Sequence, residues 1–89
     1  MSIKKVEEKF LTGDQSRAAR MLLHWTQSDL EMASGVSSAT IKDLEGGRRE
    51  ITAIMKSRIF DAYYQNGIRF SNNDNIISVS LILEKSIKN

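Results

Sequence analysis

The feature that most constrains this chain is a glycine that separates two short helical patterns. Gly35 follows residues 27–34, which Thr26 precedes as a capping residue. Asp29 takes the third helical position, where its carboxylate suits the positive end of a helix. The residue just past a helix end often needs a left-handed conformation, which glycine adopts at the least cost. Val36 then supplies an apolar side chain to fill the turn. The pattern predicts a short helix that ends in a sharp turn.

A second short helix is predicted directly after this turn, over residues 38–45. Ser37 can cap it, Ile41 and Leu44 face inward at helical spacing, and the glycine pair 46–47 ends it. Two short helices around a tight turn indicate a helix-turn-helix, in which the first helix braces the second against a DNA groove. An ordinary helical hairpin in a small bundle would show the same pattern, so the spacing alone leaves both readings open.

Two further helices are predicted on either side of this unit. Thr12 and Gln15 have the spacing of a capping box, so a helix should begin there. Its stripe toward the core is expected to consist of Ala18, Met21 or Leu22, and Trp25. The other helix is predicted over residues 53–66, capped by Thr52 and stopped by Gly67, with Met55, Ile59 and Ala62 facing inward. Of the adjacent Tyr63 and Tyr64, one is expected inside and the other at the surface or against a partner.

After Gly67 the apolar pattern changes period. Residues 68–70 and 76–83 flank the turn-rich segment 71–75, which predicts a β-hairpin. In the second run, Ile77, Val79, Leu81 and Leu83 would share one face of a strand. From Val79 onward, Ile82, Leu83 and Ile87 also fit a helical stripe, so a terminal helix stays open as the alternative.

Length and composition limit the functions that the chain can have. Its 89 residues fit one domain, so we expect no second catalytic or sensing domain. The lack of cysteine excludes disulfides and thiolate metal sites and suits a cytoplasmic protein. No apolar stretch approaches the roughly 20 residues that span a bilayer, so no membrane partner is expected. His24 is a lone surface histidine, and no catalytic constellation is present, so neither enzyme activity nor a cofactor or metal is expected.

The charge balance is not decisive by itself. Thirteen basic residues against eleven acidic ones give a net charge of +2, so the placement of the bases matters more than their number. Arg48 and Arg49 form the only pair of adjacent arginines and follow the helix predicted over 38–45. There they could present two guanidinium groups to phosphate, although an isolated pair of this kind is more often a solvated loop.

The central segment resembles the Xre/Cro/cI helix-turn-helix family. The similarity rests on Trp25-Thr26-Gln27-Ser28-Asp29-Leu30, Ala33-Ser34-Gly35-Val36-Ser37, Thr40-Ile41 and Leu44-Glu45-Gly46-Gly47-Arg48-Arg49 in register. It runs from about Arg17 to Phe70. The resemblance implies a mainly α, four- to five-helix, lambda-repressor-like DNA-binding domain with a C-terminal β-hairpin or strand extension. The expected boundaries are an N-terminal extension at 1–11, the helix-turn-helix domain at 12–70 and a C-terminal tail at 71–89.

The resemblance also implies roles for individual residues. Gln27 and Arg17 would contact DNA phosphates. Base edges would be read by Ser38, Ala39, Lys42 and Asp43, with Ser37 and Thr40 as phosphate or edge contacts. The backbone-docking loop would consist of Gly46, Gly47, Arg48 and Arg49. The family usually has alanine where this chain has Glu31, so either Ala33 makes the close helix contact instead, or Glu31 lies at the rim and pairs with Lys42 or Arg20.

The resulting hypothesis is a homodimeric transcription repressor that binds a palindromic double-stranded DNA operator. The expected dimer element is the apolar tail, with Ile76, Ile77, Val79, Leu81 and Leu83, and folding of the tail onto its own core is the competing interpretation. A second class of function is an adaptor or anti-repressor that keeps the fold but binds a protein, such as a toxin or a larger regulator. Gln27 together with Arg48 and Arg49 favours DNA.

Overall fold

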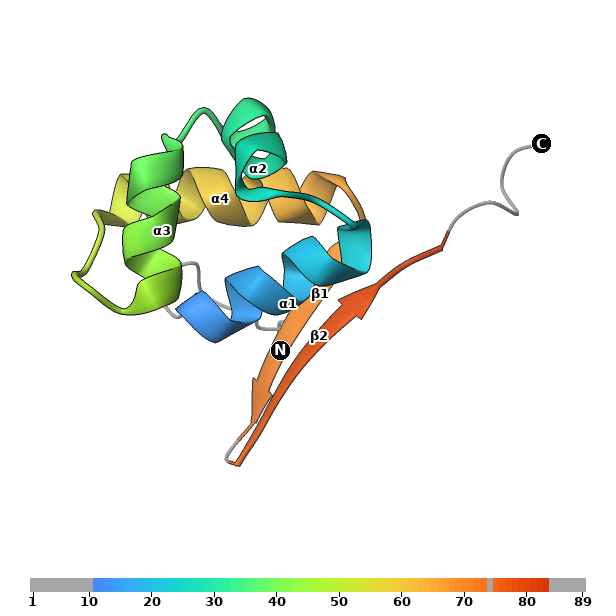
Figure 1. Ribbon diagram of the computed structural model, residues 1–89. Helices are drawn as coiled ribbons and strands as arrows, with labels where there is room; N and C mark the ends of the chain where they lie inside the picture. Colours follow the sequence, from blue (N-terminus) through green and yellow to red (C-terminus); the bar gives the residue numbers. More distant parts are fainter. Residues whose placement is uncertain (1–10, 74, 84–89) are drawn as a thin grey trace.

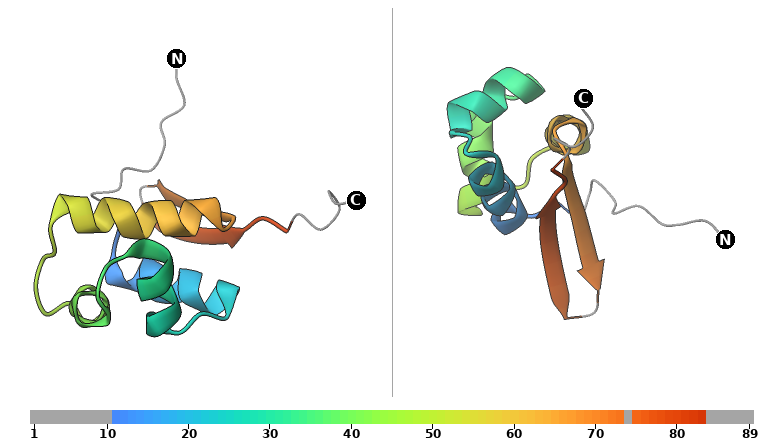
Figure 2. Two further views of the ribbon diagram at one scale, coloured as in Figure 1. Left: turned by 90° about the horizontal axis from the view of Figure 1, so that it is seen from above. Right: turned by 90° about the vertical axis from the view of Figure 1, so that its right-hand side faces the viewer.

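The computed structural model describes residues 11–73 and 75–83. In chain order its elements are α1 (Gly13–Leu23), α2 (Gln27–Ser34), α3 (Ser38–Gly46), α4 (Ala53–Gln65), β1 (Ile68–Asn73) and β2 (Ile76–Leu81). The strands form an antiparallel hairpin that runs beside α1 and projects past the helices (Figure 1). Seen along α4, the first three helices lie to one side and the hairpin extends below α4 (Figure 2). The predicted mainly α domain with a C-terminal hairpin is confirmed.

The described helices begin where the sequence places capping residues. Thr12, Thr26, Ser37 and Thr52 each accept a hydrogen bond from the backbone N–H three residues later. The first two are full capping boxes, completed by Gln15 and Asp29. Gly35 ends α2 with φ 78° and Gly47 ends α3 with φ 68°, so both glycines take the left-handed conformation expected of them. These boundaries are encoded locally.

The predicted apolar stripe of α1 is wrong in register. Met21 is 72% exposed and Leu22 39% exposed, whereas the buried face of α1 consists of Gln15, Ser16 and Ala19. The two polar side chains take inward positions because partners on other elements satisfy their hydrogen bonds. Trp25 does pack against the core, and its ring stacks on that of Tyr63 with centroids 6.0 Å apart.

The core joins all four helices to the hairpin. Its buried apolar residues are Leu11, Ala19, Leu30, Val36, Ile41, Leu44, Ile51, Ile59, Phe60, Ala62, Tyr63, Ile68 and Phe70. The predicted inward stripe of α4 is confirmed, with Met55 partly buried beside the core. Tyr63 is buried and Tyr64 is exposed, as expected for the adjacent tyrosines. Leu11 is the one described residue of the expected N-terminal extension, and residues 1–10 lie outside the described ones.

Glu31 lies at the rim of the contact between α2 and α3. Its carboxylate accepts hydrogen bonds from the hydroxyl of Ser38 (2.6 Å) and the backbone N–H of Ser38 (3.3 Å). The rim interpretation is therefore right, but the partner is Ser38 rather than Lys42 or Arg20. Ala33 is exposed, so the alternative in which it makes the close helix contact is wrong.

The hairpin pairs Phe70 with Val79 and continues in register from Ile68–Leu81 to Asn73–Ile76. The predicted turn at 71–75 was too long, because residues 71–73 belong to β1. Since β2 runs to Leu81, the alternative of a helix beginning at Val79 is wrong for these residues, and Ile87 lies outside the described part of the chain. Val79 and Leu81 pack against the core, whereas Ile77 and Leu83 are exposed.

Candidate nucleic-acid interface

The outward face of α3 carries small and polar side chains. Ala39 and Lys42 are exposed and Ser38 and Asp43 partly so, while Ile41 and Leu44 are buried on the opposite face. The helix stands at the edge of the molecule, with α2 and α1 behind its inner face (Figure 1). The four side chains expected to read bases are therefore brought together on one accessible surface.

Ser37 and Thr40 belong to the cap of α3. The Ser37 hydroxyl accepts from the backbone N–H of Thr40 at 3.2 Å and donates to the Thr40 hydroxyl at 3.0 Å. Ser37 is exposed, but Thr40 is buried and faces the interior. Thr40 is therefore not on the surface that the other candidate residues form, and its hydroxyl accepts a hydrogen bond from the capping residue Ser37.

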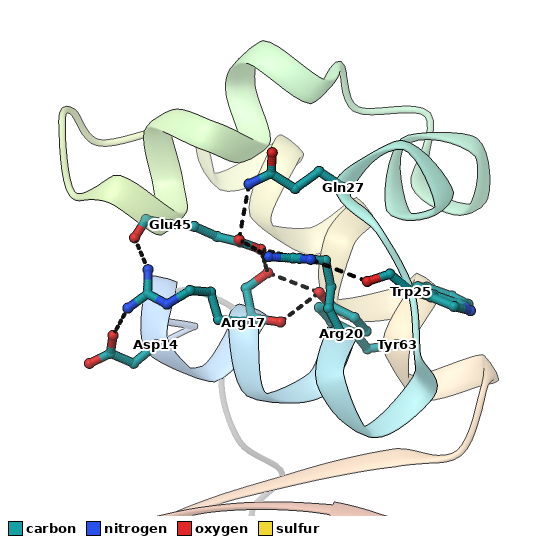
Figure 3. Close-up of polar contacts among 8 residues, drawn as sticks. Asp14, Arg17, Arg20, Trp25, Gln27, Glu45 and Tyr63 are labelled. Atoms are coloured by element: carbon teal, nitrogen blue, oxygen red, sulfur yellow. Dashed lines mark hydrogen bonds and ion pairs between the residues drawn. The ribbon is translucent and has the colours of Figure 1, made fainter.

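A buried polar cluster holds α3 in place from its last turn. Glu45 is only 6% exposed, and its carboxylate accepts from the Ser16 hydroxyl (2.6 Å), the Arg20 guanidinium (2.7 and 3.0 Å) and the Gln27 amide (3.2 Å). On the far side of Ser16, the Tyr63 hydroxyl donates to the Ser16 carbonyl at 2.9 Å. Figure 3 shows the side chains of Arg20 from α1 and Gln27 from α2 meeting at the Glu45 carboxylate. Glu45 therefore connects α3 to α1 and α2 directly and to α4 through Ser16.

The electrostatics of this cluster favour a charged carboxylate. Burial by itself would raise the pKa of Glu45, but the hydrogen bonds from Arg20, Ser16 and Gln27 outweigh it and hold that pKa below its ordinary value. The hydrogen bond to Glu45 raises the pKa of Arg20, and burial raises the pKa of Tyr63. The described residues include no buried side-chain nitrogen or oxygen without a partner. The cluster is a satisfied ion pair at neutral pH.

Sequence reasoning did not identify the role of Glu45. The sequence predicts Glu45 only as the end of the recognition helix and Arg20 only as a partner for Glu31. A signal was available, because Ile41 and Glu45 are four residues apart and so share the inward face of α3. A carboxylate on a buried helix face implies a cationic partner in the core.

Gln27 lies at the first position of α2, partly buried against this cluster. Its Nε2 donates to Glu45 at 3.2 Å (Figure 3), and that nitrogen carries a second N–H. A side-chain amide held in this way can donate its second N–H to a phosphate oxygen while the first keeps it oriented.

Arg17 and Gly13 bring the start of α1 close to the end of α3. The Arg17 guanidinium donates to the backbone carbonyl of Glu45 and to the carboxylate of Asp14 (Figure 3). A Cβ at Gly13 would lie 2.4 Å from the Leu44 carbonyl oxygen, so only glycine permits this approach. Arg17 remains about half exposed at the edge of the interface.

The loop after α3 folds back on the last turn of that helix. The Arg49 Nε donates to the Asp43 carboxylate at 2.7 Å, and the Arg48 backbone N–H donates to the Asp43 carbonyl at 3.0 Å. Gly46, Gly47, Arg48 and Arg49 are all exposed. The structure thus places both arginines and the two glycines beside the outward face of α3.

The arrangement defines a small helical domain whose second and third helices form a helix-turn-helix with an open recognition face. Comparison with protein families agrees, since the sequence profile of the helix-turn-helix family matches residues 17–63, more than half of the chain. The chain belongs to this family, of the Xre/Cro/cI type, whose members are DNA-binding regulators. A search of curated proteins gave no match.

The part of the chain that the structure describes lacks two other features. No helix there is long and apolar enough to cross a membrane. Nor do residues 11–73 and 75–83 contain a group of three or more histidine, cysteine, aspartate or glutamate side chains placed to hold a metal ion.

Proposed function

We propose that the chain is a homodimeric transcription repressor of the cytoplasm that inserts α3 into the major groove of a palindromic operator. The observation that carries this proposal is the outward face of α3. It presents Ala39, Lys42 and Asp43 to solvent, while the one other acid of the helix, Glu45, is buried and paired. A helix with small groups, a donor and an acceptor on its open side suits base edges in the major groove.

Phosphate contacts would fix the register of this helix on the duplex. The candidates lie around α3 on three elements: Arg17 in α1, Gln27 in α2, and the loop residues Gly46, Gly47, Arg48 and Arg49. The exposed guanidinium groups supply charge, and the glycines let the backbone approach a phosphate closely. Lys42 would donate to guanine and Asp43 would accept from cytosine.

The outer edge of β2 is the dimer element in this proposal. Ile82 N donates to the Gly67 carbonyl at 2.8 Å, and bonded pairs alternate along an antiparallel ladder. The backbone N–H groups of Ile77, Val79 and Leu81 therefore point away from β1, toward an edge that has no neighbouring strand in the described structure. Ile76, Ile77 and Leu83 add exposed apolar surface. A twofold copy could pair with this edge and cover these side chains.

Titration of the full chain with double-stranded DNA at several salt concentrations tests the proposal. Replacing Arg48 and Arg49 by alanine should weaken binding to all sequences and reduce the slope of log affinity against log salt by about 1 per lost phosphate contact. Arg58→Ala, which removes one exposed arginine of α4, is the control and should leave the slope unchanged. The adaptor alternative, with a toxin or regulator as partner, requires no measurable affinity for DNA.

A further inference from the structure

We infer that Arg49 is a positioning residue for base recognition, which holds the Asp43 carboxylate toward the base edges while it binds a phosphate itself. The inference rests on the proposed function and deepens it. It assigns sequence specificity to a loop residue that touches no base, through a contact present in the DNA-free protein.

The contact between these two residues is a charge-assisted hydrogen bond. Arg49 Nε lies 2.7 Å from Asp43 Oδ2, and the two side chains are 54% and 23% exposed, respectively. The backbone reinforces the approach, since Arg48 N–H donates to the Asp43 carbonyl. Arg49 therefore reaches back from the loop to the outward side of the recognition helix.

The atoms left over on both side chains fit two further ligands. A guanidinium has five N–H donors, and the bond to Asp43 comes from Nε, so the edge formed by the two terminal nitrogens remains for a phosphate. The second Asp43 oxygen, Oδ1, remains for the exocyclic amine of cytosine. Within the described residues neither side chain makes another hydrogen bond.

Electrostatics explain why Asp43 needs such a partner. A bare carboxylate on a DNA-facing helix would be repelled by the phosphates, and Arg49 cancels its charge at hydrogen-bond distance. The same hydrogen bond restrains the orientation of the Asp43 carboxylate on the helix surface. Lysine could supply the charge but not the geometry, because its ammonium is a single point charge without a second planar edge.

This difference gives a test that separates charge from geometry. The full chain and three variants, Asp43→Ala, Arg49→Lys and Arg58→Lys, would select binding sites from a randomised duplex pool. Asp43→Ala and Arg49→Lys should both lose preference at the same base pair of each half-site. Arg49→Lys should bind the wild-type operator about tenfold more weakly, with non-specific affinity within about twofold of wild type. Arg58→Lys, the same substitution at an exposed arginine of α4 outside the interface, is the control and should keep the wild-type motif.

The possible outcomes distinguish a failure of the proposed function from a wrong role for Asp43 or for Arg49. If the wild-type chain selects no motif, the proposed function fails and the inference falls with it. If the wild type selects a motif that Asp43→Ala leaves unchanged, Asp43 reads no base and the inference is overturned. If Asp43→Ala alters one position and Arg49→Lys does not, Arg49 is only a phosphate contact. Circular dichroism of each variant confirms that a lost preference does not reflect unfolding.

Discussion

The Arg20 guanidinium donates two hydrogen bonds to the Glu45 carboxylate, at 3.0 and 2.7 Å, across the contact between α1 and α3. Both side chains are mostly buried. A buried ion pair is tolerated when further hydrogen bonds satisfy its remaining atoms, and here Ser16 and Gln27 complete the carboxylate. The orientation of the recognition helix therefore depends on an electrostatic contact as well as on apolar packing.

Removal of this carboxylate should be costly. Glu45→Ala would leave the Arg20 charge without its partner in a largely buried site, so we expect the free energy of unfolding to fall by about 3–5 kcal/mol. Urea unfolding followed by circular dichroism measures this. The control is Asp61→Ala, at an exposed acid of α4, for which a change within about 0.5 kcal/mol is expected. Equal losses in the two variants would show that the buried pair does not hold the fold together.

Stability should also decline in acid through the same residue. The folded pKa of Glu45 lies below its ordinary value, about 4.3 for an unfolded glutamate, so the folded state binds fewer protons than the unfolded state. The contribution of Glu45 is therefore complete above about pH 5 and is lost as the pH falls through the folded pKa.

Comparison with Glu45→Gln isolates this contribution from the other carboxylates. The variant should be less stable than wild type at neutral pH, and the gap should narrow as the pH falls from about 5 to about 3. Parallel curves of unfolding free energy against pH would mean that Glu45 does not titrate with folding.

The parts of the fold that depend on local chemistry were predictable from the sequence. Capping by Thr12, Thr26, Ser37 and Thr52 requires only residues within one turn, and the predicted boundaries of the described helices agree with the structure to within one or two residues. The hairpin was predictable for the same reason. The buried face of α1 was not predictable, because periodicity assigns apolar residues to the inside. Met21 is exposed instead, and Gln15 and Ser16 are buried because their hydrogen-bond partners lie far along the chain.

For the candidate interface too, the placement of residues was predictable but some of their contacts were not. Family resemblance placed Lys42, Asp43 and the arginine loop on the recognition side, and the structure brings them together. The bond between Arg49 and Asp43 was not predictable, because it depends on the path of the loop after Gly47. The same limit applied to Glu45, whose partners come from two other helices.

Gly13 should tolerate no larger residue, although it lies in the first turn of a helix. A Cβ there would meet the Leu44 carbonyl oxygen at 2.4 Å and the Glu45 Cα at 2.8 Å, so backbone must move. We expect Gly13→Ala to destabilise the chain by about 1–3 kcal/mol. At Gly46 a Cβ would meet only the Arg48 side chain, at 3.7 Å, so Gly46→Ala should be neutral or stabilising by up to about 1 kcal/mol. Thermal unfolding of both variants tests this, and the same sign of change in the two would contradict it.

The exposed end of β2 allows a direct test of the proposed dimer. Deletion of β2 would remove Val79 and Leu81 from the core, so a point substitution at its exposed end is the cleaner test. Ile77 is 59% exposed and its backbone N–H points away from β1, to the edge of β2 that pairs with no strand in the described structure, where a lysine should oppose strand pairing. Each subunit would lose one isoleucine from the interface, and a fully buried isoleucine contributes about 1.5–3 kcal/mol. Ile77→Lys should therefore raise the dimer dissociation constant at least tenfold.

Ile54→Lys, at a 67% exposed position of α4, adds the same charge away from the hairpin and should leave the dimer intact. Light scattering over a range of concentrations measures both, and a monomeric wild-type chain, or an Ile77→Lys variant that dimerises as tightly as wild type, would rule out the β2 edge as the dimer element.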